Sequence, residues 1–403
     1  MENCQELKHC LACGNKSLQL ELTLGNQPLA NNFKKNLEEE DHYPLAVNRC
    51  TQCCHLQLTH IVDPAIIYKN YSYVSGTSQT YKDYMWWFAK WCREYSNKWR
   101  GSVLDIGCND GSQLDYFHTL GYKTYGVDPA ENLYLTSSTK GHQVVCGFWN
   151  EQSIGNLDNR KFDIVVSQNA FAHNPDPLAY LKLLSPLLND DGLFFIQTSQ
   201  ANMVRNGEFD TIYHEHVNFY NVNSMNELCW RAGMFLIDVV KTPIHGTSYV
   251  FVVSNRDTGC EHVKNLIAME HDLLQQETYT KWAVTAKSLT DQFLDKCETY
   301  RTQGYQLIGY GAAAKGNTLL NYAGVTLDYI IDDNPIKQNT YSPGTNIPVV
   351  GIDLLKQYNA QDKILFVPLA WNFYKEIKSK IKAARTNTND RFLKYFPEVE
   401  VEI

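Results

Sequence analysis

The stretch that decides the fold is LDIGCNDGSQ, Leu104 to Gln113, because an apolar run there gives way to turn-forming residues and then to a helical pattern. We expect a strand, a tight loop and the start of a helix. Gly107 and Gly111 allow the backbone to turn sharply and to approach a ligand without a side chain in the way. Polar side chains stand at the expected helix start, where they can act as caps: Asn109, Asp110 and Ser112.

The charge around this loop indicates its ligand. The next expected strand, 123–127, ends in Asp128, where a carboxylate can bind both hydroxyls of a ribose. A pyrophosphate cofactor needs the fuller G-x-G-x-x-G spacing, and Asp105 and Asp110 would repel its phosphates. The same charges suit the amino and sulfonium groups of S-adenosylmethionine (SAM). We therefore predict a methyltransferase; the alternatives are another nucleotide-binding crossover and a loop that binds nothing.

Strands and helices alternate from Gly101 to Gln197. This rhythm predicts a parallel sheet with helices on both faces and with ligands at the carboxyl ends of the strands. Asn150 and Asn169 follow two of the expected strands and are candidates for the donor site. His173, in the run SQNAFAHNPDP, is a candidate for the reaction itself, although a single histidine there can equally cap a helix or pack.

Composition limits the class of protein. The 403 residues allow two or three domains, and an apolar content of 44% is ample for packed cores. A net charge of -8 without a long basic run argues against a nucleic-acid partner. No apolar run is long enough to span a bilayer, and the first ten residues lack the apolar core of a signal peptide. We expect a cytoplasmic monomer or small homo-oligomer without a membrane partner.

Four of the 12 cysteines have the spacing of a metal site. Cys10-x-x-Cys13 and Cys50-x-x-Cys53 form two turns that can each direct two thiolates at one tetrahedral ion, which we expect to be zinc. Four thiolates leave no open coordination position, so the predicted role is structural. Unpaired buried cysteines are the alternative, and the neighbouring Cys54 and His55 complicate the choice of ligands.

A hydroxyl-rich run, YKNYSYVSGTS, follows the second cysteine pair and precedes an expected helix over 79–98. Each tyrosine alone can be an ordinary packing residue. Together with Ser75 and Ser78, the run has the composition of a loop that donates hydrogen bonds into a pocket.

The run Tyr213-His214-Glu215-His216 is a second group of reactive side chains. His-x-His spacing can hold a metal, but no further acid or histidine nearby completes such a site. A histidine with a carboxylate partner is suited to be a general base, because its unperturbed pKa is about 6.5 and the partner orients the ring.

The last third contains another strand, glycine turn and helix start, in QLIGYGAAAKGNT, residues 306–318. Lys315 would stand beside helix N-terminal amides, which suits phosphate oxygens. Expected strands over 327–331 and 364–368 complete a second crossover fold. Its G-x-G-x-x-A loop is also compatible with NAD, and a domain that only supports the first is a third possibility.

In this order the motifs resemble those of the SAM-dependent sugar C-methyltransferases that act on nucleotide-linked keto-deoxysugars. The resemblance covers nearly the whole chain and rests on CxxC…CxxC, Y-x-Y-x-S-G-x-S, LDIGCNDGS, NAFAHNPD, YHEH, GYGAAAKGNTLLNY and DDNPIKQNTYSPGTNIPV. It implies an α/β protein with three parts: a Cys4 zinc module over 1–70, a Rossmann-like SAM domain over 71–255, and a Rossmann-like domain for the nucleotide sugar over 256–403.

The resemblance also implies roles for individual residues. The active site would contain Tyr71 or Tyr73, His173, Tyr213, Glu215 and His216. His216 would remove a proton next to a ketone, and a tyrosine or His173 would stabilise the enolate before its carbon takes the methyl group. The substrate would be carried on thymidine diphosphate and methylated at C-3, with these candidate contacts: Ser75, Ser78, Lys315, Asn317 and Trp371.

Two other functions fit parts of the sequence. An O- or N-methyltransferase of another small molecule would use the same donor loop without needing an enolate. A zinc-ribbon interaction protein on a degenerate methyltransferase fold would use the cysteines alone, but the acidic net charge and the complete donor loop argue against it.

Overall fold

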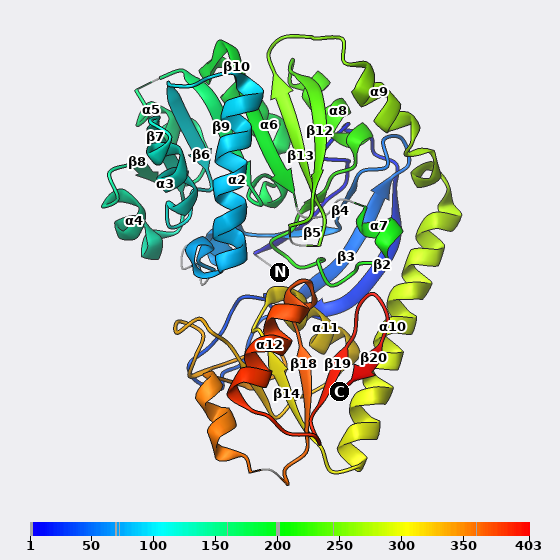
Figure 1. Ribbon diagram of the computed structural model, residues 1–403. Helices are drawn as coiled ribbons and strands as arrows, with labels where there is room; N and C mark the ends of the chain where they lie inside the picture. The colour runs from blue at the N-terminus through cyan, green and yellow to red at the C-terminus, as the bar shows by residue number, and fades with distance from the viewer. Residues whose placement is uncertain are drawn as a thin grey trace. The chain divides into compact units, whose positions relative to one another are not determined.

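The computed structural model describes residues 3–68, 71, 73–158, 160–198, 202–244, 246–359 and 361–403. Its contacts divide the chain into two compact units, each containing its own seven-stranded sheet (Figure 1). The first unit consists of Met1–Leu20, Asn48–Asn202 and Glu215–Gln275. The second consists of Glu21–Val47, Met203–His214 and Gln276–Ile403.

The sheet of the first unit has the strand order β12-β13-β10-β9-β6-β7-β8. Its strands are β6 (Ser102–Ile106), β7 (Lys123–Asp128), β8 (Gln143–Cys146), β9 (Phe162–Gln168), β10 (Leu188–Thr198), β12 (Phe235–Thr242) and β13 (Ser248–Ser254). The five strands from β6 to β10 are parallel, as predicted. Beyond the stretch for which a parallel sheet was predicted, 101–197, the sheet continues with β13, which runs antiparallel to β10 and β12. The connection between β12 and β13 is too short for a crossover, which forces a hairpin.

Helices cover both faces of this sheet. They are α2 (Gln79–Ser96), α3 (Ser112–Thr119), α4 (Glu131–Ser138), α5 (Glu151–Gly155), α6 (Pro177–Leu184), α8 (Val222–Arg231) and α9 (Glu261–Ala268), with short 3-10 turns at η1 (Ser75–Thr77), η2 (Phe171–His173), η3 (Ser185–Leu187) and η4 (His271–Leu274). Alternate strand residues separate two cores. Val103, Ile164 and Phe195 pack with α2 on one face, whereas Leu104 and Val165 pack with α6 and α8 on the other.

The N-terminal part adds small sheets. β1 (Cys4–Glu6) pairs with β5 (His60–Val62), which is followed by the short helix α1 (Pro64–Tyr68). β2 (Leu18–Gln27), β3 (Tyr43–Cys50), β4 (Leu56–Leu58) and β11 (Asn218–Phe219) form a four-stranded sheet in the order β11-β4-β3-β2. β2 carries the chain out of the first unit, and β3 carries it back.

The second unit is a second α/β fold, as the sequence predicts. The strand order is β16-β17-β15-β14-β18-β19-β20, with the central five strands parallel and both edge strands antiparallel. Its strands are β14 (Gln306–Tyr310), β15 (Tyr329–Ile331), β16 (Thr340–Tyr341), β17 (Pro348–Val350), β18 (Ile364–Pro368), β19 (Arg391–Lys394) and β20 (Glu400–Glu402). Its helices are α7 (Met203–Asn206), α10 (Gln276–Thr302), α11 (Ala314–Ala323) and α12 (Tyr374–Ala384), with 3-10 turns η5 (Ile352–Gln357) and η6 (Trp371–Phe373). No helix in the described ranges has the length and apolar character needed to cross a membrane.

Candidate active site

The predicted glycine loop joins β6 to α3 and has the backbone geometry that its glycines suggest. Gly107 and Gly111 have φ angles of 88° and 77°, a region that side-chain-bearing residues rarely adopt. Asp128, at the end of β7, accepts a hydrogen bond from the Asn109 backbone N–H at 2.8 Å and another from the Ala130 N–H at 2.8 Å. These bonds fix the carboxylate beside the loop.

Buried carboxyl groups make the end of this sheet suited to a cation. Asp105 is 3% exposed, and burial raises its pKa to about 8, with Asp128 and Asp110 adding to the rise. Burial also raises the pKa of Asp128. A positively charged ligand would relieve this repulsion, whereas a pyrophosphate would increase it. The residues present therefore fit SAM.

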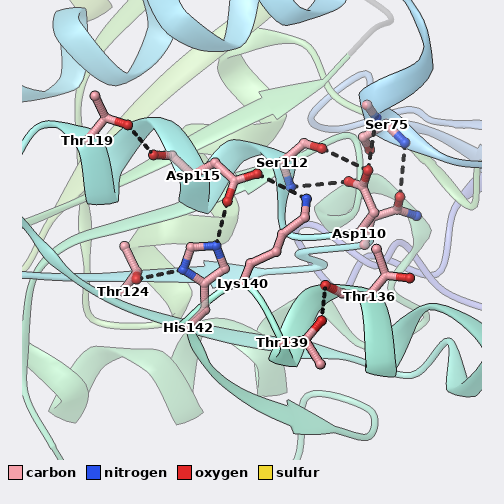
Figure 2. Close-up of polar contacts among 12 residues, drawn as sticks. Ser75, Asp110, Ser112, Asp115, Thr119, Thr124, Thr136, Thr139, Lys140 and His142 are labelled. Atoms are coloured by element: carbon pink, nitrogen blue, oxygen red, sulfur yellow. Dashed lines mark hydrogen bonds and ion pairs between the residues drawn. The ribbon is translucent and has the colours of Figure 1, made fainter.

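Two of the predicted donor ligands hold a neighbouring loop. The Asn109 side chain accepts from the Ser75 N–H at 3.0 Å and donates to the Tyr73 carbonyl at 3.1 Å. The Asp110 Oδ2 accepts from the Gly76 N–H at 3.2 Å. It also accepts from the Ser112 hydroxyl at 2.7 Å (Figure 2). The hydroxyl-rich run is thereby bound to the glycine loop. Lys69, Asn70 and Ser72 in that run lie outside the described residues.

A polar group behind the glycine loop escaped the sequence analysis. His142 lies between the Thr124 hydroxyl at 2.9 Å and the Asp115 carboxylate at 3.0 Å, and Lys140 also contacts Asp115 at 3.0 Å (Figure 2). A Cβ on Gly111 would lie 3.2 Å from the His142 ring. The histidine therefore supports the loop from behind, and nothing in the local sequence pattern indicates it.

The other predicted residues at the strand ends have structural contacts of their own. Asn150 caps α5 in a capping box with Ser153. Asn169 has a φ of 57° and donates its N–H to the Gln197 carbonyl at 2.9 Å. Ser78 is the N-cap of α2 and accepts from the Tyr81 N–H. Their roles in ligand binding stay predictions.

Four of the predicted catalytic residues meet in the first unit. Tyr71 donates its hydroxyl to Glu215 Oε2 at 2.6 Å. The rings of His173 and His216 lie 5.2 Å apart between centroids. Glu215 and His216 are 3% and 4% exposed, and a turn at residues 214–215 directly precedes His216. The ring of Tyr73 lies next to that of Tyr71, with 6.4 Å between the ring centroids, and Tyr73 is 39% exposed. Tyr213 belongs to the second unit.

His173 is held as a neutral imidazole. Burial lowers its pKa to about 4, and its Nε2 is buried without a hydrogen-bond partner among the described residues. A neutral ring can donate one N–H to a developing oxyanion, but a pKa this low makes it a weak base near neutral pH.

Tyr68 is a site residue that the sequence analysis did not select. Its ring stacks on His173 with centroids 5.6 Å apart, and its hydroxyl donates to the Glu215 carbonyl oxygen at 3.2 Å. The close spacing of Tyr68, Tyr71 and Tyr73 was the available signal. It could not distinguish which tyrosine faces the histidines, because that depends on contacts with residues far away in the sequence.

The four predicted cysteines form one cluster with all thiol sulfurs within 4.8 Å of one another. Cys10 Sγ lies 3.6 Å from Cys53 Sγ, and Cys13 Sγ lies 3.5 Å from Cys50 Sγ. Tetrahedral zinc with Zn–S bonds of about 2.3 Å places its sulfurs roughly 3.8 Å apart, so the residues fit zinc. His55 is no ligand: its Nε2 contacts Asn218 Oδ1 at 3.1 Å.

The candidate substrate residues of the second unit are engaged within that unit. Asn317, 1% exposed, donates to the Ala30 carbonyl at 2.7 Å. Trp371 donates its indole N–H to Asp210 Oδ2 at 2.8 Å. Lys315 Nζ lies 3.8 Å from Glu208 Oε2 and 4.9 Å from the centre of the Trp371 ring.

Known proteins match the chain along nearly its whole length. Three domain families match in succession: a "putative zinc binding domain" over 10–68, a methyltransferase domain over 87–239, and a C-methyltransferase C-terminal domain over 243–397. C-methyltransferase NovU of Streptomyces niveus is 27% identical over 98% of this chain and 97% of its own length. The chain is therefore similar to C-methyltransferases along nearly its whole length, as the order of its motifs indicates.

Matches to other methyltransferases cover less of this C-methyltransferase. A ubiquinone biosynthesis O-methyltransferase of Glaesserella parasuis is 31% identical over 24% of this chain and 44% of its own length. A solved S-adenosylmethionine-dependent methyltransferase of Clostridium acetobutylicum is 14% identical, with a TM-score of 0.35, and covers 44% of this chain and 92% of that one. SAM is the methyl donor of the protein and zinc its metal ion, in agreement with the donor loop and the four-cysteine cluster.

Proposed function

We propose that this SAM-dependent C-methyltransferase methylates a carbon next to the ketone of a nucleotide-diphosphate-linked deoxysugar, carried on thymidine diphosphate and methylated at C-3. The observation that carries the proposal is the group formed by His216 and Glu215, which are buried, and by Tyr71 and His173, which are half-buried. Oxygen and nitrogen nucleophiles already have lone pairs, whereas a carbon nucleophile needs a base that makes an enolate. This group contains both a base and donors for the resulting oxyanion.

In this proposal His216 is the base. Its imidazole takes the proton from the carbon next to the ketone, and the electron pair of that C–H bond becomes the enolate. The Tyr71 hydroxyl holds Glu215 at 2.6 Å, which fixes the turn that carries His216. His173, neutral because of its burial, donates a hydrogen bond to the enolate oxygen.

When bound, SAM supplies an electrophilic methyl group that is already activated. The protein's own work is therefore to make the carbon nucleophile, to orient it and to exclude water. The zinc site takes no part in this chemistry, because four thiolates fill its coordination shell. The proposed role of the second unit is to bind the nucleotide sugar, with Lys315 as a contact.

The test is a substrate panel. Keto sugars linked to thymidine, guanosine and uridine diphosphate are incubated with the protein and methyl-labelled SAM in deuterium oxide. We expect methyl transfer to carbon for the thymidine-linked sugar, and exchange of the hydrogen next to the ketone even without SAM. Methyl label found on oxygen or nitrogen would contradict the proposal. So would methyl transfer if the hydrogen next to the ketone exchanged with solvent in none of the substrates.

A further inference from the structure

A buried group of charged residues in the second unit contains polar atoms that the protein itself leaves unused. Glu208 and Asp210 are 2% and 1% exposed, and the side chain of Lys315 is 13% exposed. Trp371 and Tyr395 complete this group, which we name the 208–210 cluster. All five residues belong to the second unit.

One oxygen of each carboxylate is satisfied. Asp210 Oδ2 accepts from the Trp371 indole and from the Tyr395 hydroxyl, both at 2.8 Å. Glu208 Oε1 accepts from the Asn206 amide at 2.9 Å. These bonds fix the orientation of the two carboxylates. The second oxygen of each carboxylate, Glu208 Oε2 or Asp210 Oδ1, takes no part in them.

Three atoms of the cluster have no hydrogen bond within the described part of the chain: Glu208 Oε2, Asp210 Oδ1 and Lys315 Nζ. The ion pair between Lys315 and Glu208 spans 3.8 Å, which is longer than a hydrogen bond. Buried polar atoms without partners are costly and rare in folded proteins, so three in one cluster need an explanation.

The charges of the cluster narrow the class of ligand. Two carboxylates and one lysine carry a formal net charge of -1. A diphosphate placed against Lys315 would also meet the oxygens of Glu208 and Asp210 and be repelled. A hydroxyl group can instead donate its hydrogen to a carboxylate and accept one from the lysine.

We propose that the 208–210 cluster binds sugar hydroxyls, with Glu208 Oε2 and Asp210 Oδ1 accepting from them and Lys315 Nζ donating to them. This inference rests on the proposed function and deepens it, because it assigns Lys315 to the hydroxyls of the substrate and not to its diphosphate. The hydroxyls belong either to the hexose or to the nucleoside. The two sources are separated by comparing ligands with and without the hexose.

The experiment is calorimetric titration of the zinc-loaded full chain, saturated with S-adenosylhomocysteine, with thymidine diphosphate and with thymidine diphosphate glucose. The variant is Glu208→Gln, which keeps the size of the side chain and removes its charge. We expect the glucose conjugate to bind about 10- to 100-fold more weakly, as for loss of a charge-assisted hydrogen bond. Binding of thymidine diphosphate stays unchanged if the hexose is the source and weakens equally if the nucleoside is.

The sign of the effect separates this inference from a phosphate site. If the cluster bound a diphosphate instead, Glu208→Gln would tighten the binding of both ligands, because it removes a repelling charge. Lys315→Met would then weaken the binding of both ligands, whereas Glu208→Gln would weaken the binding of neither. Either result, or an unchanged affinity in Glu208→Gln, would overturn the inference. If the wild-type protein bound neither ligand, the proposed substrate class itself would fail.

Two further variants guard against misfolding. Asp210→Asn retains an oxygen that can accept from Trp371 and Tyr395. We expect this variant to weaken the binding of thymidine diphosphate glucose by a similar factor. Glu402→Gln is the control, because it makes the same chemical change in a different ion pair of this unit, the one with Lys378. It should leave the affinities for thymidine diphosphate and for its glucose conjugate unchanged. Thermal melting of each variant confirms that it is folded.

Discussion

At the residue scale, the two histidines of the active site differ in what their surroundings allow. Burial keeps His173 neutral, with a pKa of about 4, so it is poorly suited to take a proton near pH 7. His216 lies next to Glu215, which Tyr71 holds in place. The proposed division into one base and one hydrogen-bond donor rests on these contacts, because the residue types are identical.

Replacing the base tests this division. We expect His216→Asn to lower kcat by about 10²- to 10⁴-fold, the usual contribution of a positioned general base. Asparagine retains a polar side chain of similar reach but cannot take the proton. The affinity for S-adenosylhomocysteine should stay the same, because the predicted donor contacts lie on and around the glycine loop and not at His216. A large loss of donor affinity in a folded variant would show that His216 shapes the donor site instead.

Asp105 predicts a pH dependence of donor binding. Its pKa is about 8 in the free protein because of burial and the nearby Asp128 and Asp110. A cationic donor favours the ionised carboxylate, so SAM should bind more tightly as the pH rises from 7 to 9, with release of a proton. S-adenosylhomocysteine lacks the sulfonium charge and should show a smaller dependence. Calorimetry in buffers of different ionisation enthalpy measures the proton release, and Asp105→Asn should abolish it.

At the element scale, the strand, glycine loop and helix of each unit could be predicted from local pattern, since apolar runs, glycines and caps are all local features. The contacts between separate elements could not. Asn109 and Asp110 have the expected residue types for donor ligands, yet they hold the backbone of residues 73–76. Tyr68 and His142 were missed for the same reason, because their partners lie far away in sequence.

The contact between these two loops depends on Gly76. A Cβ there would lie 2.5 Å from the Ser112 hydroxyl oxygen and 2.6 Å from Asp110 Oδ2, so these side chains would have to move away from the loop or the loop from them. We expect Gly76→Ala to weaken S-adenosylhomocysteine binding by roughly 10-fold, about the value of one lost charge-assisted hydrogen bond. The measurement is calorimetric titration.

Gly155→Ala is the matched control, because a Cβ at that position meets nothing within 4 Å. Its donor affinity should equal that of the wild type. Equal affinity in Gly76→Ala as well would mean that the 73–76 loop does not need its contact with Asp110 for donor binding.

At the scale of the whole molecule, the chain passes between its two units several times. Glu21–Val47 and Met203–His214 belong to the same unit as Gln276–Ile403. Asn317 bonds to Ala30, and Asp210 bonds to Trp371 and Tyr395. Sequence patterns indicate where elements begin and end, but they carry no local signal for partners almost 300 residues apart.

The zinc site is part of the core of the first unit. Cys10, Cys50 and Cys53 pack in the same apolar cluster as the strands and helices of the methyltransferase sheet. Arg231, on α8, donates to the Ala12 carbonyl at 2.5 Å, and Asn221 donates to the Cys54 carbonyl at 2.8 Å. The loops that bind zinc are therefore joined to the donor-binding fold by apolar and polar contacts alike.

This shared core predicts that loss of zinc affects more than the N-terminal loops. We expect Cys10→Ser to lower zinc content and to lower the melting temperature of the donor-binding unit together, because a structural zinc site contributes on the order of 10 kcal/mol of folding free energy. Zinc content is measured by mass spectrometry of the metal and melting by scanning calorimetry, with S-adenosylhomocysteine added to identify the transition of the donor-binding unit. Cys146→Ser, at an exposed cysteine outside the cluster, is the control and should change neither quantity. A zinc-free Cys10→Ser protein with an unchanged donor-stabilised transition would show that the zinc loops fold independently, and the shared core would then not be what joins them to the active site.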